Sequence, residues 1–389
     1  MLKQKTKILR IATVPVSLKV LTKGQLRFLG QNNYEVYSMS AKGPEIDEVV
    51  AQEQVIQHFT IDLTRTISPF RDLKAIFECY RIIKKIKPDI VHTYTPKAGL
   101  VGMIAAFLAS VPLRLHNVTG LPLMEQTGYK KQILVWVEKL TYLLASQVYV
   151  NSVGLMAFIK NNIYDNPKLK ILGNGSTNGI DGSFFESNES LIEKSKVTKV
   201  ELGIKPSDFV WLFIGRIVKD KGINELIEAF LQITTKYPSM KLILVGPYEN
   251  DLDPILPKTQ TEINTNKNII SVGFQNDVRS YLQLADCLVF PSYREGLPNV
   301  PMQAACFDLP VIATDINGCN EIIEHEINGL LVRPKDTLAL QNAMLRIYTN
   351  ETLRNNIKAK TRAMILEKYS QAVVWNNLLA EYKHLLENI

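Results

Sequence analysis

The sequence predicts an α/β protein made of two doubly wound domains in series, on three observations. Apolar, strand-like runs alternate with amphipathic runs of helix length along most of the chain, which is typical of parallel sheets. The 389 residues, 46% of them hydrophobic, allow more than one packed core, because a single core stops growing near ~250–300 residues. One irregular stretch, from Gly173 to Gly182, interrupts the alternation and divides it into two series.

The first series begins at the N-terminus. The predicted strands are residues 7–14, 34–41, 88–95, 111–118 and 146–152, and the predicted helices are residues 21–31, 68–86, 98–110 and 131–145. In the helix over 68–86, apolar positions recur at intervals of three and four. Asp72 lies in its first turn and Lys84, Lys85 and Lys87 lie in its last, an arrangement that suits the helix dipole.

The second series follows a polar segment, residues 187–199, which the sequence indicates as the domain boundary. Its predicted strands are residues 208–216, 240–247, 268–274, 286–292, 309–315 and 329–334, and its predicted helices are residues 223–237, 278–285, 299–307, 337–350 and 371–386. The apolar stripe of the last helix comprises Val374, Leu378, Tyr382 and Leu385. We expect domains at residues 1–186 and 187–369, followed by a C-terminal helix over 370–389, with ligands bound near the carboxyl ends of the strands.

Charge and composition narrow the possible partners and the location. Residues 1–190 carry 23 basic and 15 acidic side chains, whereas residues 191–389 carry 22 and 23, so only the first half is basic. Anionic lipid, a phosphorylated acceptor and nucleic acid all fit that half. The longest uncharged stretch, residues 98–113, is shorter than the ~20 apolar residues of a spanning helix, and no leader is apparent. We therefore expect a cytoplasmic chain that does not span the membrane.

Cysteine and histidine spacing predicts neither disulfides nor a metal site. The four cysteines lie far apart without a C-x-x-C pair, which favours reduced residues in or near the core. The five histidines are dispersed and show no ligand spacing with carboxylates or cysteines.

Two segments of the second half carry residues suited to a phosphorylated sugar. In the first, a strand ends at Phe290, a loop holds Glu295, and a helix begins near Asn299. Gln303 stands eight positions after Glu295, and we expect the two side chains to face one cleft, about two helical turns apart. The alternative is that Glu295 is an ordinary surface residue and that Gln303 lies on a polar, solvent-facing side of the helix.

The second segment runs from Val210 to Phe230, where a buried strand leads into Gly215 and Arg216 and then into Lys221 near a helix start. Gly215 allows close backbone approach, and the two basic side chains suit a diphosphate leaving group, whose charge grows as its bond breaks. Two exposed basic residues in a loop would be the alternative.

Together these segments resemble retaining GT-B glycosyltransferases of family 4. The resemblance rests on GRIVKDKGI (215–223), on EGLP (295–298) and on the spacing from Glu295 to Gln303. In the first half, residues 87–106, 113–121 and 148–152 resemble the branch that extends undecaprenyl-diphosphate-linked sugars in capsule, O-antigen or glycan assembly. The resemblance covers nearly the whole chain. It implies two Rossmann-like domains with an interdomain cleft and a C-terminal helix that crosses back onto the first domain.

The family's donor-binding roles transfer residue by residue. Arg216 and Lys221 match the pair that holds the donor diphosphate, and Glu295 matches the first glutamate of an E-x7-E motif that contacts the donor sugar. Gln303 replaces the second glutamate, which binds ribose, so we expect donor binding that is retained but weaker or differently oriented. The implied donor-binding set is Gly215, Arg216, Lys221, Glu295, Gly296, Leu297, Pro298, Asn299 and Gln303.

In the first domain the resemblance places His116 near the donor sugar, as a group that orients or polarises it. His92 and Lys97 are assigned to the acceptor side. Residues 14–20 replace the glycine pair of the wider family, so Ser17 or a neighbouring backbone amide would reach the donor phosphate. For each histidine, a structural role in the core is the alternative.

Taken together, these observations predict an enzyme that transfers a hexose-type residue from a nucleotide sugar with retention of configuration. The resemblance implies that the nucleotide is UDP. The expected acceptor is a polyprenyl-diphosphate-linked saccharide at the inner face of the plasma membrane, where the basic first half would meet anionic headgroups. No metal is expected to be required. Three rivals remain: a nucleotide-sugar epimerase of the same fold, a non-catalytic sugar-nucleotide binding protein, and a nucleic-acid-binding protein, for which no recognised module is present.

Overall fold

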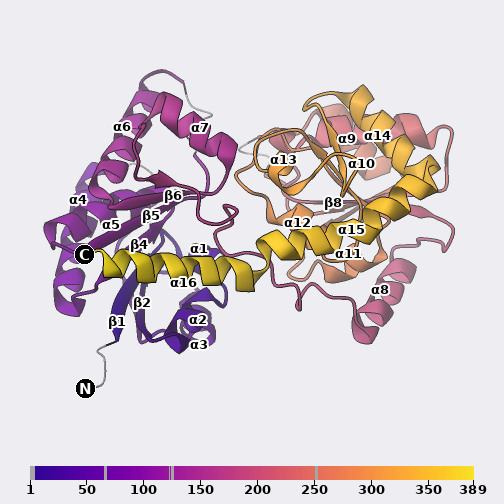
Figure 1. The fold of residues 1–389 in the computed structure, drawn as a ribbon. Helices are drawn as coiled ribbons and strands as arrows, with labels where there is room; N and C mark the ends of the chain where they lie inside the picture. The colour runs from indigo at the N-terminus through magenta and orange to yellow at the C-terminus, as the bar shows by residue number, and fades with distance from the viewer. Residues whose placement is uncertain (1–4, 65–67, 122, 124–126, 250–252) are drawn as a thin grey trace. The chain divides into compact units, whose positions relative to one another are not determined.

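The computed structural model describes residues 5–64, 68–121, 123, 127–249 and 253–389. It divides the chain into two compact units, Met1–Gly179 together with Gln371–Ile389, and Ile180–Ser370. Each unit is a parallel sheet covered by helices on both faces (Figure 1), so the predicted α/β class is confirmed. The units are called the first and the second domain below.

The first domain has a seven-stranded sheet in the order β3-β2-β1-β4-β5-β6-β7. Its strands are β1 (Thr6–Ile11), β2 (Tyr34–Ser40), β3 (Gln57–Thr60), β4 (Ile90–Tyr94), β5 (Leu113–Val118), β6 (Gln147–Val150) and β7 (Leu169–Lys170). All neighbouring strands pair in parallel. The chain therefore winds outward from the centre in both directions, and the order switches between β1 and β4.

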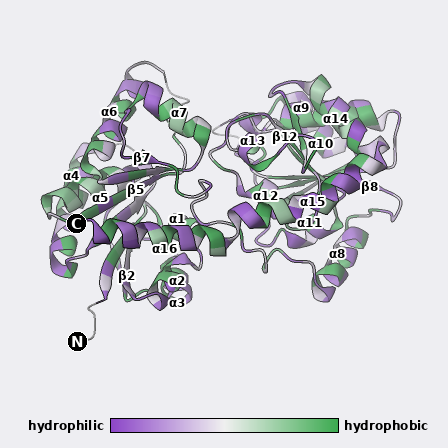
Figure 2. Cartoon of the chain, in the orientation of Figure 1, coloured by the Kyte–Doolittle hydropathy of each residue, from purple (hydrophilic) through white to green (hydrophobic). Residues whose placement is uncertain are grey.

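Helices cover the two faces of this sheet separately. They are α1 (Pro15–Leu21), α2 (Gln25–Gln31), α3 (Ile46–Glu53), α4 (Pro69–Ile86), α5 (Pro96–Leu108), α6 (Gly128–Leu144), α7 (Val153–Asn162) and α16 (Gln371–Glu387). The core under α4 to α7 includes Cys79, Val101 and Tyr142. The core on the other face includes Leu26 of α2 and Tyr382 of α16. Hydrophobic colouring predominates on the strands of both domains in Figure 2.

The second domain has a six-stranded sheet in the order β10-β9-β8-β11-β12-β13. Its strands are β8 (Phe209–Ile214), β9 (Met240–Val245), β10 (Ile269–Gly273), β11 (Cys287–Phe290), β12 (Val311–Thr314) and β13 (Leu330–Val332). Its helices are α8 (Glu189–Glu201), the 3-10 turn η2 (Lys219–Lys221), α9 (Ile223–Thr234), α10 (Pro257–Thr265), α11 (Arg279–Leu284), α12 (Asn299–Ala305), α13 (Cys319–Ile322), α14 (Thr337–Thr349) and α15 (Glu351–Tyr369). The strand order switches between β8 and β11.

Several predicted elements need correction. The helix expected over 21–31 begins only at Gln25, as α2, and a separate helix that was not predicted, α1, ends at Leu21; Gly24 between them has a φ of 78°. The polar segment expected at the domain boundary, residues 187–199, is largely α8, whose N-terminus the Asn188 side chain caps. The division between the domains falls after Gly179, which lies within the irregular stretch 173–182, and not after residue 186. Helix α8 buries Ser195 and Thr198 beside Leu191, so the sequence shows no apolar stripe there.

The C-terminal helix packs on the first domain. Helix α16 belongs to the first domain (Figure 1), where its Val374, Leu378 and Tyr382 are buried and the last two join the core beneath the first sheet. The Trp375 ring lies 5.3 Å from the Phe28 ring, and its indole N–H donates to Asn178 at 2.9 Å. Tight apolar packing with directed hydrogen bonds thus holds the end of the chain to its beginning.

Candidate functional site

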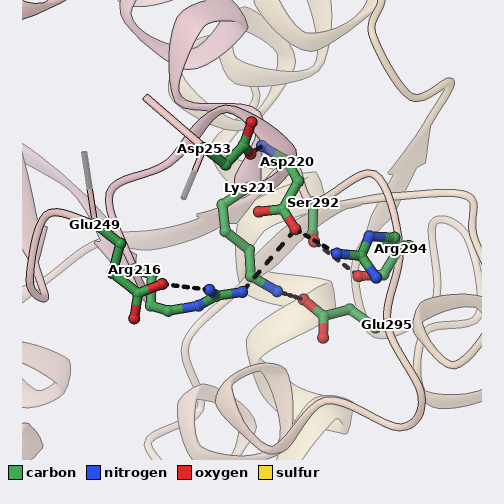
Figure 3. A network of polar contacts seen from close by, with 8 residues as sticks. All are labelled: Arg216, Asp220, Lys221, Glu249, Asp253, Ser292, Arg294 and Glu295. Atoms are coloured by element: carbon green, nitrogen blue, oxygen red, sulfur yellow. Dashed lines mark hydrogen bonds and ion pairs between the residues drawn. The ribbon is translucent and has the colours of Figure 1, made fainter. Parts of the chain in front are cut away.

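A network of charged side chains lies at the carboxyl ends of β8, β9 and β11 in the second domain (Figure 3). Arg216 follows β8, Glu249 follows β9 and Glu295 follows β11. Since β8 and β11 flank the point where the strand order switches, the network occupies the place where open α/β sheets bind their ligands.

Lys221 and Glu295 form the most enclosed ion pair of this network. Lys221 Nζ lies 2.6 Å from Glu295 Oε1, and the two side chains are 15% and 16% exposed. Gly222 brings their loops together: its φ is 70°, and a Cβ there would lie 2.1 Å from the carbonyl oxygen of Pro291. Only glycine allows η2 to approach the loop after β11 this closely.

Asp220 connects two arginines at the same edge. Its Oδ2 accepts from Arg294 Nη2 at 2.9 Å and lies 3.9 Å from Arg216 Nη2, while Arg216 Nη1 donates to Glu249 at 2.6 Å. Asp220 Oδ1 is buried without a hydrogen-bond partner among the described residues. Burial raises the pKa of this carboxyl above its usual value. The arginines are therefore held in place by carboxylates, with their side chains 41% exposed.

The loop over residues 295–298 is fixed from behind by Asn317, whose Nδ2 donates to the carbonyl oxygens of Glu295 and Gly296 at 3.0 and 3.3 Å. Helix α12 begins at Asn299, so Glu295 precedes it and Gln303 lies only about one turn inside it. The loop position of Glu295 and the helix start near Asn299 are as predicted, but the helical part of the spacing is about one turn and not two. Asn299 is exposed, Gln303 is half-buried, and the Gln303 side chain has no hydrogen bond within the described ranges.

His116 does not occupy the position expected of a group beside the donor sugar. It lies within β5 and is 1% exposed, with Nδ1 2.8 Å from the Thr93 hydroxyl. A Cβ on Gly99 would lie 2.5 Å from its Cε1, which shows how closely α5 packs over the ring. Burial lowers the pKa of His116 to about 3. This position supports the alternative of a neutral histidine in the core.

The two residues assigned to the acceptor side, His92 and Lys97, also make their contacts inside the first domain. His92 is buried within β4, where its ring bonds Arg10, Tyr382 and Asn117 at 2.6–2.8 Å. Lys97 forms a 2.6 Å ion pair with Asp72 that joins α5 to α4, and its side chain is 11% exposed. Both contacts serve the packing of the first domain.

Ser17 differs from those two, because it is half-buried in α1, just after the carboxyl end of β1. It is therefore placed near the β1/β4 switch point. The hydroxyls of Thr13 and Thr95, which follow β1 and β4, lie 2.7 Å apart at this point. Thr95 has a φ of 71°, which is rare for a β-branched residue.

The burial of His116 predicts a pH dependence. A histidine with a lowered folded pKa binds fewer protons in the folded than in the unfolded state between about pH 3 and 6.5, so stability falls on acidification through this window. Replacing His116 with Gln should remove up to about 1.4 kcal/mol per pH unit from that slope. Urea unfolding at several pH values checks this; an unchanged slope would contradict the buried, neutral state.

Comparison with known proteins agrees with this architecture. Residues 194–364 match the family model of glycosyl transferases group 1, and residues 10–152 match a glycosyl transferase 4-like model. The capsular polysaccharide biosynthesis glycosyltransferase CapM of Staphylococcus aureus is 32% identical over 382 residues, 98% of each chain. The chain belongs to the group 1 glycosyltransferases. It is therefore a transferase enzyme, as predicted.

Two further comparisons extend this family assignment. The Escherichia coli enzyme named UDP-Gal:alpha-D-GlcNAc-diphosphoundecaprenol alpha-1,3-galactosyltransferase is 31% identical over 325 residues, 82% of this chain and 80% of the relative. The crystal structure of Anabaena Alr3699/HepE with UDP superposes with a TM-score of 0.79 at 19% identity, covering 97% of this chain and 100% of that one. The likeness confirms the GT-B fold. These transferases give no support to the epimerase alternative.

Some residues of the network were missed by sequence reasoning. Arg294, Asp220 and Glu249 each follow a predicted strand at the same edge of the second sheet, next to residues that were identified. Charge immediately after a buried strand was the signal that could have found them. Within the described parts of the chain, no group of three or more His, Cys, Asp or Glu side chains could hold a metal ion.

Proposed function

We propose that this glycosyltransferase moves a hexose-type residue from a UDP-linked donor, with retention of configuration, to a polyprenyl-diphosphate-linked saccharide in surface polysaccharide synthesis. The observation that carries the proposal is the Lys221–Glu295 pair at the switch point of the second sheet, with Arg216 beside it. The names of two relatives support the choice of pathway: one acts in capsular polysaccharide biosynthesis, and one uses UDP-Gal and a diphosphoundecaprenol-linked acceptor.

The donor diphosphate is taken by Lys221 and Arg216. Both cations are already held by carboxylates, Lys221 by Glu295 and Arg216 by Glu249, so little side-chain ordering remains when the donor binds. Charge that develops on the departing diphosphate is stabilised by these two groups. Because they supply positive charge directly, donor binding requires no metal ion.

Glu295 serves the donor sugar while keeping Lys221 in place. One of its carboxylate oxygens accepts from Lys221, and the other is available to a sugar hydroxyl. In the proposed front-face reaction, the bond between the anomeric carbon and the diphosphate breaks as the acceptor oxygen bonds to the same face. The acceptor's proton passes to the departing phosphate oxygen. No protein nucleophile takes part.

The acceptor requires that the enzyme work at a membrane surface. None of the helices in the described residues is long and apolar enough to span a bilayer. We therefore place the enzyme in the cytoplasm as a peripheral protein of the inner face of the plasma membrane, with its basic first half toward anionic headgroups.

Thermal stabilisation of the purified protein by a panel of nucleotides and nucleotide sugars tests the donor assignment. UDP and one UDP-sugar should raise the melting temperature equally with Mg²⁺ and with EDTA, because a ligand that binds only the folded state stabilises it. A shift with a different nucleotide would redirect the donor assignment. No shift with any of them would contradict the proposed site.

Replacing Gln303 with Glu should keep transfer activity and tighten donor binding. The half-buried amide offers a single oxygen acceptor, whereas a carboxylate accepts two charge-assisted bonds from a ribose. We expect a dissociation constant for UDP that falls by about threefold to tenfold, measured by isothermal titration calorimetry. Gln303→Asn, which shortens the side chain and keeps the amide, is the matched control. Complete loss of activity in Gln303→Glu would show that this position serves another purpose.

A further inference from the structure

The outward side of α6 is apolar and its inward side is partly polar. Large hydrophobic side chains follow one another at intervals of four, three, four and three along the exposed side: Tyr129, Ile133, Trp136, Leu140 and Leu143, with exposures of 86%, 50%, 72%, 41% and 49%. The buried positions of the helix are Glu138, Thr141 and Tyr142. A helix on the surface of a water-soluble domain normally shows the reverse pattern.

Helix α4 continues this apolar surface. Phe70, Leu73 and Phe77 lie on one side of the helix and are 89%, 65% and 60% exposed. The same side ends in basic residues, and the Arg81 guanidinium lies 5.9 Å from the centre of the Phe77 ring. Helix α5 packs between α4 and α6 on one face of the first sheet (Figure 1), and its exposed end carries Phe107 and Leu108.

The charges on this surface are predominantly positive. The basic residues are exposed or half-buried: Arg71, Lys74, Arg81, Lys84 and Lys85 on α4, and Lys130, Lys131 and Lys139 on α6. The acidic residues of the two helices are either buried or paired with a lysine. Glu138 is buried at 4% exposure, Asp72 pairs with Lys97 at 2.6 Å, and Glu78 lies 3.8 Å from Lys74.

An anionic bilayer matches both properties at once. Tryptophan and tyrosine prefer the boundary between headgroups and acyl chains, and nearby lysines and arginines bind anionic headgroups. A protein partner would instead favour a surface depleted of lysine at its centre. We propose that the outward face of α4, α5 and α6, the lipid-binding face, is the surface by which the first domain binds anionic phospholipid. The inference rests on the proposed function only in that a lipid-linked acceptor needs such contact.

Vesicle binding of the full chain tests the proposal. The protein should co-sediment with vesicles of phosphatidylcholine mixed with phosphatidylglycerol, and much less with phosphatidylcholine alone. Ile133→Gln combined with Trp136→Gln should weaken the binding by about tenfold or more, because both side chains are exposed and would lose their burial in lipid. The matched control is Val200→Gln with Phe274→Gln, which removes two exposed apolar side chains of the second domain.

Tryptophan fluorescence gives an independent readout. The chain has three tryptophans, of which Trp211 is fully buried and Trp375 packs on Phe28, so Trp136 is the one that lipid can reach. Phospholipids brominated on their acyl chains should quench the native protein and leave Trp136→Phe nearly unquenched. Lys130→Gln with Lys131→Gln should weaken the preference for anionic vesicles, because each basic residue contributes to it.

Three results would overturn the proposal: no vesicle binding by the native chain, native-like binding by the Ile133/Trp136 variant, or a native dimer that this variant converts to monomer without any vesicle binding. The last would make the face a contact between copies of the chain. Stabilisation by UDP is measured in parallel on every variant. Its absence from the native chain would count against the proposed function and would leave the lipid-binding face untouched.

Discussion

Replacing Lys221 with alanine is expected to reduce glycosyl transfer by roughly 10²–10³-fold, the cost of removing one preorganised group that stabilises developing charge. Lys221 Nζ lies 2.6 Å from Glu295 at the switch point of the second sheet, and its side chain is only 15% exposed. The loss should fall mainly on kcat, because the negative charge of the leaving diphosphate is greatest in the transition state. The measurement is UDP release from the stabilising UDP-sugar with a polyprenyl-diphosphate-linked saccharide.

One further variant separates the effect of the Lys221 charge from the effect of its packing, and a second variant serves as a control. Lys221→Met keeps the aliphatic stem and should lose as much activity as Lys221→Ala. Lys196→Ala removes a lysine of the same domain whose side chain is 67% exposed and pairs with the exposed Glu193, and it should retain full activity. Near-normal turnover in both Lys221 variants would show that the diphosphate is bound elsewhere.

Glu295→Ala should abolish most transfer as well, since it removes the proposed contact to the donor sugar and releases Lys221. Because the two residues act as one unit, the double variant should be little worse than either single variant. Additive losses would instead mean that the two side chains act independently.

Replacing Tyr382 with alanine is expected to lower the free energy of unfolding of the first domain by about 3–5 kcal/mol. Tyr382 is a fully buried residue of α16, its ring lies 5.9 Å from that of Tyr34, and its hydroxyl lies 2.6 Å from His92 Nδ1. The substitution leaves a cavity and takes a partner from a buried histidine. Urea unfolding followed by Trp375 fluorescence measures the effect, because Trp375 lies on the same helix.

Tyr382→Phe keeps the ring and loses only the hydroxyl, so it should cost about 1–2 kcal/mol. Lys383→Ala, at an exposed position of the same helix, should leave the unfolding curve unchanged. Stabilisation by UDP should persist in Tyr382→Ala at temperatures where the second domain stays folded. A loss below about 1 kcal/mol in Tyr382→Ala would mean that α16 contributes little to the first domain.

Much of the site in the second domain was predictable because its signals are local. A buried strand such as β8 is a continuous apolar run, and the charged residues that follow such strands must emerge at one edge of a parallel sheet. Arg216, Lys221 and Glu295 were identified in this way. Asp220 and Arg294 carry the same signal, although their bonds to each other depend on how two loops, 74 residues apart, approach at Gly222.

The environment of the two histidines in the first domain could not be predicted from local sequence patterns. His92 and His116 both lie in strands, and the sequence does not distinguish a side chain that faces a ligand from one that faces a covering helix. His92 meets Tyr382, 290 residues away, and His116 is enclosed by α5 through Gly99.

By itself the sequence determined the two α/β series and the charged residues that lie at the carboxyl ends of the strands in the second domain. The tertiary structure alone decided the burial of the histidines, the polar-faced helix α8 and the outward apolar side of α6. Periodicity records which side chains share a face, whereas only packing between distant segments decides what covers that face.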